Sequence, residues 1–251
     1  MKFLNKMIIA AALMVSGTSV VYAACASNPM GQPQSHLKLL NVCHEGYAVG
    51  YNPATKSPAW VSQDLKRENL DEKNTSRVDN FRPDPSIPVQ YSATLKDYAR
   101  SGYDRGHMAP SEDFRESAQQ MDESFFLSNI VPQNPDNNRG IWLLAEKNTR
   151  YWAKKYQQVL VVTGPIYDNG KTMGFAGKVP VPTHIYKVVY APGINQGLAF
   201  IVENIPLERQ HLPFAVHSIS EVEKRTGITF FPKADPGFKN TIPEDWLVFN
   251  K

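Results

Sequence analysis

One segment of the sequence, residues 137–156, has the spacing of an amphipathic helix and is followed at once by an apolar run. Trp142, Ala145, Thr149 and Trp152 recur every three to four positions, which is the period of one helical face. The next segment, QVLVVTGPIY, is apolar without alternation, which favours a buried strand. A helix with one apolar stripe beside a buried strand predicts a fold that combines helices with a sheet.

The rest of the pattern predicts further strands and a second helix. Residues 44–65 read as two strands joined by the turn YNPATKSP, and residues 183–192 and 196–204 read as a strand pair. Residues 214–227 are expected to form a helix that is closed by a glycine, and residues 228–232 a last strand. No repeat or linker is visible, so we expect one α+β domain over residues 24–251, with a central antiparallel sheet flanked by helices.

Polar segments separate these elements. Asn137 or Asn138 is expected to cap the first helix, and Ser218 lies near the start of the second. Residues 67–88 are polar and rich in proline, so they are expected to form a long connecting loop of the kind that often carries function. Residues 101–114 are expected to be rich in turns.

The first residues, 1–23, have the pattern of a secretory signal peptide. Two lysines precede the uncharged apolar run 7–15, and Val21 and Ala23 occupy the −3 and −1 positions of a cleavage site. The apolar run is too short to cross a bilayer as a helix, so no membrane anchor is expected. The mature protein is therefore expected in the periplasm or the medium. Loss of the two lysines would leave little of the formal net charge of +3, so any site for an anion must be local.

The two cysteines of the chain, Cys25 and Cys43, allow two readings. An exported chain with one pair of cysteines favours a disulfide, which would stabilise the fold by ~3 kcal/mol. Cys25 also lies next to the predicted cleavage site, where lipid modification is conceivable, but Tyr22 replaces the leucine-like residue that usually precedes a lipidated cysteine. The two uses of Cys25 exclude each other, and we favour the disulfide.

The stretch SGYDRGHMAPSEDF gathers ionisable groups that suit phosphodiester chemistry. Asp104, Arg105 and His107 lie within four positions, with Gly106 expected to let the backbone turn tightly. A histidine can deprotonate water near neutral pH, and an arginine can grip a phosphate. Mg²⁺ could neutralise developing charge while needing few protein ligands. The alternative is that His107 makes only a structural hydrogen bond in a turn.

A second segment, LSNIVPQNPDNNRGIWLLAE, supplies polar partners around the start of the predicted helix. Asn138 and Glu146 are eight positions apart, or about 80° around and ~12 Å along a regular helix. One could hold a metal ion while the other holds a water bound to it. The alternative is a capping asparagine and a solvated pair between Glu146 and Arg150.

Together these two segments resemble the DNA/RNA non-specific endonuclease family, which has a ββα-metal finger at its active site. The similarity extends through SRVDNFRPDPSIP, VVTGPIY, VPTHIYKVVY and EVEKRTGITFFP, in the order the family has them, and covers nearly all of the mature chain.

The resemblance implies roles for individual residues. His107 would be the general base and Asn138 the sole direct protein ligand of Mg²⁺, with Mn²⁺ as a possible substitute. Glu146 would orient a metal-bound water, and Asn129 would support the geometry of the site. The arginines expected to reach or shape the phosphate site are Arg77, Arg105 and Arg150.

Two further residues are expected to stand outside the catalytic set. Asp104 is interpreted as a structural partner within its motif, and Arg139 is not assigned to catalysis. His184 is expected to be a core or hydrogen-bonding histidine.

The resemblance implies a metal-dependent endonuclease that cleaves DNA and RNA and leaves 5′-phosphates. Its partners would be single- or double-stranded nucleic acids, contacted mainly through phosphates. Two alternatives remain: a phosphodiesterase for small nucleotides on the same fold, and a nucleic-acid-binding protein without catalysis. The sequence leaves open whether the chain forms a homodimer or binds an inhibitor protein.

Overall fold

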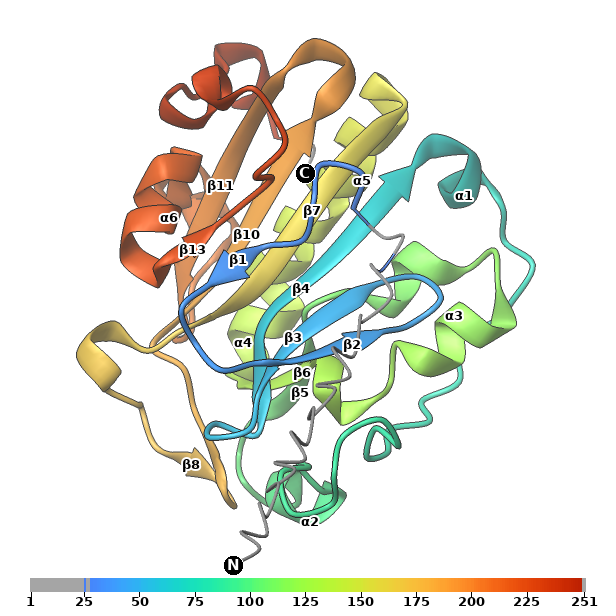
Figure 1. The fold of residues 1–251 in the computed structure, drawn as a ribbon, viewed down its shortest axis with the longest axis vertical. Helices are drawn as coiled ribbons and strands as arrows, with labels where there is room; N and C mark the ends of the chain where they lie inside the picture. Colours follow the sequence, from blue (N-terminus) through green and yellow to red (C-terminus); the bar gives the residue numbers. More distant parts are fainter. Residues whose placement is uncertain (1–24, 26–27, 250–251) are drawn as a thin grey trace, which may run out of the picture.

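A seven-stranded antiparallel sheet forms the centre of the molecule (Figure 1). The computed structural model describes Cys25 and residues 28–249, so the predicted signal peptide, residues 1–23, lies outside the described residues. The strand order is β12-β11-β10-β7-β4-β3-β2, with every neighbouring pair antiparallel. The strands are β2 (Leu40–Cys43), β3 (Ala48–Asn52), β4 (Ser57–Lys66), β7 (Gln158–Ile166), β10 (His184–Ala191), β11 (Gln196–Glu203) and β12 (Val216–His217).

The helices are short except for one. The α-helices are α1 (Arg67–Asp71), α2 (Leu95–Tyr98), α3 (Ala118–Glu123), α4 (Pro135–Asn137), α5 (Leu143–Tyr156) and α6 (Ile219–Thr226), with a π-helical segment η3 (Asn138–Trp142). The 3₁₀ turns are η1 (Ser111–Phe114), η2 (Leu127–Asn129), η4 (Asp168–Gly170), η5 (Pro192–Ile194), η6 (Arg209–Ala215), η7 (Pro236–Asn240) and η8 (Glu244–Trp246). Helices on a central antiparallel sheet confirm the expected α+β fold class.

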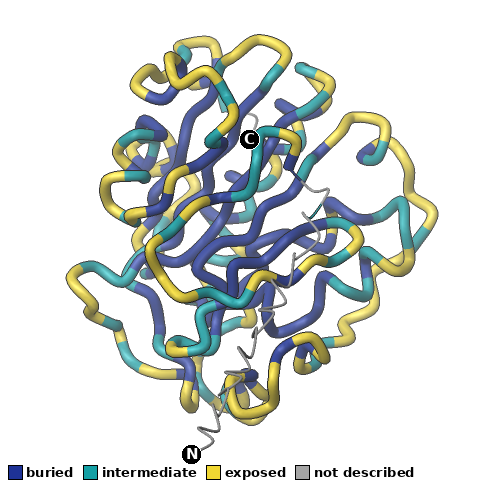
Figure 2. The backbone as a smooth tube through the Cα atoms, in the orientation of Figure 1, coloured by how far each residue is buried: buried dark blue, intermediate teal, exposed yellow. Residues whose placement is uncertain are grey.

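Alternation along the central strands divides the core into two layers. Val161 pairs with Val189, and both pack in the layer that includes Trp142 and Trp152 of the long helical region. The next pair, Val162 and Val188, packs in the layer that includes Ile219 and Val222 of α6. The central strands are therefore buried on both faces, as Figure 2 shows, while the connecting loops are exposed.

Three two-stranded sheets complete the fold. β5 (Asp104–His107) pairs with β6 (Ile130–Gln133), β8 (Phe175–Ala176) with β9 (Val179–Pro180), and β1 (Gln34–Ser35) with β13 (Ile228–Thr229). Strand β5 of the first pair lies within residues 101–114, which were expected to be rich in turns.

Three expected boundaries were wrong. The segment 67–88 begins with helix α1 and is not a loop throughout. The last strand is limited to Ile228–Thr229 because the backbone N–H of Phe230 donates to Glu223 of α6, and Phe231 takes a φ of 49°. That left-handed backbone ends the extended run. Helix α6 is confirmed over Ile219–Thr226, with Ser218 and Glu221 in a capping box and Gly227 at a φ of 68°. Its expected start at residue 214 was wrong, because η6 extends to Ala215 and Val216–His217 form β12.

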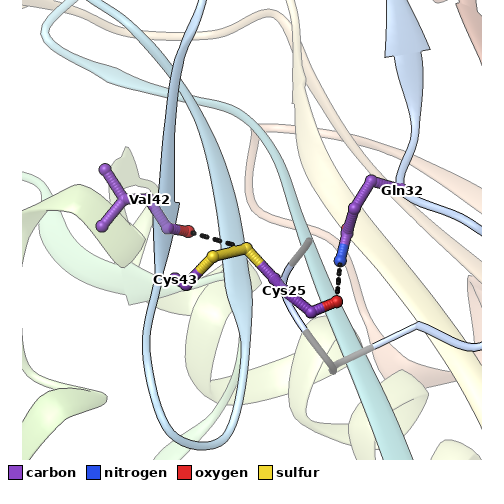
Figure 3. Close-up of a disulfide and its surroundings, with 4 residues drawn as sticks. All are labelled: Cys25, Gln32, Val42 and Cys43. Carbon is purple, nitrogen blue, oxygen red and sulfur yellow. Dashed lines mark hydrogen bonds between the residues drawn. A yellow bond between two sulfur atoms is a disulfide. The ribbon is translucent and has the colours of Figure 1, made fainter. Parts of the chain in front are cut away.

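A disulfide joins Cys25 to Cys43 at the end of β2, as Figure 3 shows, with a Cα–Cα distance of 5.4 Å. The side chain of Gln32 donates to the carbonyl oxygen of Cys25 at 3.2 Å. The favoured reading of the two cysteines is therefore confirmed, and the cross-link ties the N-terminal segment to an edge strand of the sheet. Within the described residues, no helix has the length and apolar character required to cross a membrane.

Candidate active site

An open cavity of about 790 Å³ lies where the β5–β6 pair meets the start of the long helical region. Six of the seven residues assigned to the site by sequence line it: Arg77, Arg105, His107, Asn138, Glu146 and Arg150. The other lining residues are Asp79, Phe81, Asp104, Pro110, Ser111, Glu112, Arg139, Leu143 and Lys147. Residues more than 70 positions apart in the sequence therefore share one cavity.

The β5–β6 pair places His107 at the cavity wall. Asp104 pairs with Gln133 at one end of the ladder, and His107 pairs with Ile130 at the other. Gly106 lies in the middle of β5 and not in a turn, which corrects the expected role of this glycine. A Cβ at position 106 would lie 2.2 Å from Oε1 of Gln133, so the strand approaches that side chain too closely for any larger residue.

Asn129, the seventh assigned residue, is fully buried behind the cavity wall and not part of its lining. Its side chain accepts from the N–H of Ala109 at 2.9 Å and donates to the carbonyl groups of Ala109 and Ser124, each at 2.8 Å. Its backbone carbonyl accepts from Met108 at 2.9 Å. Asn129 thus fixes the backbone that follows His107.

His107 is a neutral imidazole in a buried position. Its relative exposure is 8%, and its Nε2 atom has no hydrogen-bond partner among the described residues. Burial lowers the pKa of His107 to about 3, and the charge of nearby Arg77 adds to this effect. His107 lines the cavity, and a neutral imidazole there can accept a proton from a molecule bound in the cavity.

The helical region starts earlier than the sequence predicted. Asn134 caps it, accepting from the N–H groups of Asp136 and Asn137, and Pro135 occupies the first turn. The expectation that Asn137 or Asn138 is the cap was therefore wrong, because the rigid φ of proline suits the first helical position.

A π-helical segment, η3, separates α4 from α5 and changes which side chains share a face. A π turn accommodates one extra residue. In a regular helix, seven positions make two turns to within about 20°. With the extra residue, the eight positions from Asn138 to Glu146 make about the same two turns, so the two side chains lie about 20° apart around the helix axis. This corrects the 80° expected for a regular helix. Both side chains line the same cavity.

Asp104 holds the side chains that precede this helix. Its Oδ2 accepts from Nδ2 of Asn138 at 2.9 Å and from Nε of Arg139 at 2.9 Å, and its Oδ1 accepts from Nη2 of Arg139 at 2.7 Å. The amide nitrogen of Asn138 is therefore directed towards β5, which leaves its amide oxygen for another partner.

Glu146 is a carboxyl group that burial makes harder to ionise. Burial raises the pKa of Glu146 to about 7, and the charge of Arg150 opposes that rise. Arg150 in turn forms a largely buried ion pair, because its Nη1 donates to Oδ1 of Asp113 at 2.8 Å. Oδ2 of Asp113 accepts from Nε2 of Gln63 at 2.7 Å. Gln63 of β4 therefore holds Asp113 of η1, and Asp113 in turn holds Arg150 of α5.

The other cations of the cavity are held less firmly. Arg77 is about half exposed; its Nε donates to Asp79 at 2.7 Å and its Nη1 to Ser111 at 3.1 Å. Within the described part of the chain, Arg105 and Lys147 form no ion pair. These two cations are available to an anionic ligand.

The residues present fit a hydrated divalent cation. No group of three or more His, Cys, Asp or Glu side chains that could hold a metal occurs among the described residues. The amide oxygen of Asn138 and the carboxylate of Glu146 are hard oxygen donors in one cavity. Mg²⁺ prefers oxygen ligands and keeps several waters, so a site with few protein groups suits it.

Sequence reasoning missed three residues of this region. Asp113 lies within the quoted motif segment, but only the fold shows that it pairs with Arg150. Lys147 follows Glu146 directly, and Phe81 lies in the polar loop; neither position carried a distinguishing pattern. His184 hydrogen-bonds as expected: its Nδ1 lies 2.9 Å from Asp168, next to Arg225.

The chain is similar to known nucleases in sequence. Residues 27–236 match the family model described as DNA/RNA non-specific endonuclease. Mitochondrial nuclease EXOG of Xenopus laevis is 40% identical over 206 residues, which cover 75% of this chain and 57% of that protein. Nuclease C1 of Cunninghamella echinulata var. echinulata is 36% identical over 209 residues, which cover 76% of this chain and 82% of that protein. The chain spans 57–60% of the length of the EXOG nucleases it matches.

A solved structure has the same fold. It is described as the crystal structure of the EndoG/EndoGI complex, on the mechanism of EndoG inhibition. The match has a TM-score of 0.75 at 31% identity and covers 85% of this chain and 93% of that one. The residues matched by the family model include every segment that lines the cavity.

Proposed function

The chain belongs to the DNA/RNA non-specific endonuclease family, and we propose that it hydrolyses phosphodiester bonds within DNA and RNA in a reaction that requires Mg²⁺ or Mn²⁺. The observation that carries this proposal is one cavity lined by a neutral buried imidazole, two oxygen donors for a cation and five cationic side chains. This combination supplies a base, a metal position and phosphate-binding groups together.

His107 acts as the general base. It takes a proton from a water molecule whose oxygen bonds to phosphorus in line with the departing 3′ oxygen. The bond between phosphorus and the 3′ oxygen breaks, and that oxygen takes a proton from solvent, so the products carry a 5′-phosphate and a 3′-hydroxyl. The low pKa of His107 keeps the imidazole neutral across the physiological range, which is the form that can accept a proton.

Asn138 would hold the divalent cation directly and Glu146 would orient a water bound to it; the cation would neutralise charge on the phosphate and on the leaving oxygen. Asp104 orients the amide of Asn138 for this task. Arg77 and Arg105 bind the phosphate, and Arg150 remains in its pair with Asp113 beside Glu146. Contacts of this kind are made to phosphate and not to base edges, so we expect weak sequence preference.

The mature protein acts outside the cytoplasm in this proposal. Two features support it: the signal-peptide pattern of residues 1–23, and the Cys25–Cys43 disulfide, a bond that persists in oxidising compartments.

Digestion of a supercoiled plasmid and of a long RNA, with and without a chelator, tests the activity. We expect both to be cleaved by the wild type only when the divalent cation is present. His107→Ala should slow cleavage by about 10²- to 10⁴-fold, the usual worth of a general base. Equal rates for this variant and the wild type would overturn the assignment of the base. Cleavage of a dinucleotide but of neither polymer would instead favour a small-nucleotide phosphodiesterase.

A further inference from the structure

Two phenylalanine rings lie beneath the groups assigned to the reaction. Phe81 lines the cavity, and Phe125 is fully buried behind it. Their ring centroids are 4.9 Å apart and their planes are at 89°. This edge-to-face arrangement is one that aromatic pairs prefer, and we call the two packed rings the phenyl pair.

The imidazole of His107 packs against both rings of the phenyl pair. Its centroid is 5.3 Å from that of Phe81 and 5.1 Å from that of Phe125, with its plane at 87° to the latter. Nε2 of His107 has no hydrogen-bond partner among the described residues. Aromatic packing is therefore a main determinant of the direction in which this imidazole points.

The phenyl pair also supports two arginines of the cavity. The guanidinium carbon of Arg105 lies 4.1 Å from the centroid of Phe81, and that of Arg77 lies 5.3 Å from the centroid of Phe125. Both fall within the range of cation–π attraction, roughly 6 Å. Arg105 forms no ion pair within the described residues, and its guanidinium lies over the ring of Phe81.

We propose that Phe81 is a positioning residue that holds the general base His107 and the phosphate-binding Arg105 in one fixed relation. This inference rests on the proposed function. A role for Phe81 as a stacking platform for nucleobases is less well supported, because the ring already contacts Arg105, His107 and Phe125.

Kinetics of four variants test the proposal. Phe81→Leu and Phe81→Met remove the aromatic ring and keep an apolar side chain, whereas Phe81→Tyr keeps the ring. We expect kcat to fall about 10- to 100-fold in the first two, since a small misplacement of a catalytic group has effects of that size. Phe81→Tyr should stay within about threefold of the wild type. The matched control is Phe249→Leu, which alters a partly buried ring packed on Trp152 and Phe200, away from the cavity.

A double-mutant cycle separates positioning from general destabilisation. Because Phe81 and Arg105 share one contact, Phe81→Leu and Arg105→Gln together should reduce kcat by less than the product of their separate effects. Phe81→Leu and Arg150→Gln should combine close to multiplicatively. The proposal is overturned if Phe81→Leu keeps the wild-type kcat, if Phe249→Leu lowers kcat equally, or if the Phe81–Arg105 cycle shows no coupling.

The ring protons of His107 give a readout that needs no activity. In NMR spectra we expect Phe81→Leu to shift the His107 ring resonances, because a neighbouring aromatic ring is lost, and Phe249→Leu to leave them unchanged. If the wild type cleaves no nucleic acid but this shift occurs, the proposed function fails and the packing of His107 on Phe81 stands. If the wild type cleaves nucleic acid but neither kcat nor the resonances change, the inference about Phe81 fails alone.

Discussion

Asp104 accepts a hydrogen bond of 2.9 Å from the amide nitrogen of Asn138, and so determines which way that amide faces. Asp104 lies in strand β5 and Asn138 at the start of the π-helical segment, 34 positions later. The contact connects the strand that carries His107 to the helix that carries the oxygen donors of the cavity.

The first prediction concerns this contact. Asp104→Ala should raise the Mg²⁺ concentration for half-maximal cleavage by about 10- to 100-fold, because groups that orient a metal ligand usually contribute that much to metal affinity. Excess Mg²⁺ should restore much of the rate. The control is Arg139→Met, which removes the other partner of Asp104 but leaves its bond to Asn138. An unchanged Mg²⁺ requirement in Asp104→Ala would show that Asn138 needs no such orientation.

The contact between Asp104 and Asn138 could not be predicted from the sequence, although much of the fold could. The fold class, the long helical region and the paired strands could be predicted, because apolar periodicity reflects which faces are buried. The position of Asp104 opposite Asn138 depends on the β5–β6 ladder and on the helix start at Pro135. The tertiary pairing of strands sets both, and no local pattern reports it.

The π-helical segment η3 also could not be predicted from the sequence, and it differs from a regular helix by one residue. A regular helix would separate Asn138 and Glu146 by about 80°, and one extra residue in η3 brings them close to the same face. No pattern in the local sequence predicts that extra residue. The role of Asp113 was missed for a related reason, since its partner Arg150 comes from a distant helix.

The second prediction concerns pH. Burial raises the pKa of Glu146 from its ordinary value to about 7. Without a cation, the contribution of this carboxyl group to the free energy of unfolding is therefore fully present below its ordinary pKa and is lost as pH rises through 7. Cation binding needs the ionised form and should therefore strengthen as pH rises through 7.

Calorimetric titration with Mg²⁺ at pH 6 and pH 8 measures this effect. We expect affinity to be roughly tenfold higher at pH 8, and the difference to disappear in Glu146→Gln. His107 cannot produce it, because burial lowers the pKa of His107 to about 3 and the imidazole stays neutral at both pH values. Equal affinities in the wild type would mean that Glu146 does not control cation binding.

The third prediction concerns the buried pair between Asp113 and Arg150. Asp113→Leu leaves the guanidinium of Arg150 without its partner and should destabilise the protein by about 3–5 kcal/mol, a fall of ~6–20 °C in the unfolding midpoint. The double variant Asp113→Leu/Arg150→Met removes both charges and should be more stable than Asp113→Leu alone. Calorimetric or denaturant unfolding of all three proteins decides this. A double variant no more stable than Asp113→Leu would contradict it.

The fourth prediction concerns the disulfide between Cys25 and Cys43. Replacing both cysteines with serine should lower the free energy of unfolding by about 3 kcal/mol, because the unfolded chain regains the freedom that the cross-link removes. Cleavage rates well below the unfolding midpoint should not change, since neither cysteine lines the cavity. A reducing agent should lower the stability of the wild type and leave the variant as it was. If the reducing agent leaves the stability of the wild type unchanged, or if the serine variant is as stable as the wild type, the disulfide does not stabilise the fold.

The fifth prediction concerns Lys147, an exposed cation of the cavity that forms no ion pair within the described residues. Lys147→Met should weaken binding of a nucleic acid duplex by a similar factor for any sequence, because a lysine that contacts phosphate reads no bases. The slope of log affinity against log salt should fall in magnitude by about 1, as expected for one phosphate contact.

The control for this prediction is Lys154→Met on the same helix. Nζ of Lys154 donates to Asp71 at 2.7 Å, and Lys154 does not line the cavity. Binding is measured in Ca²⁺, to suppress cleavage, at several salt concentrations. If Lys147→Met and Lys154→Met give the same slope as the wild type, the phosphate path does not run along this face of α5, and Arg77 and Arg105 alone must hold the substrate.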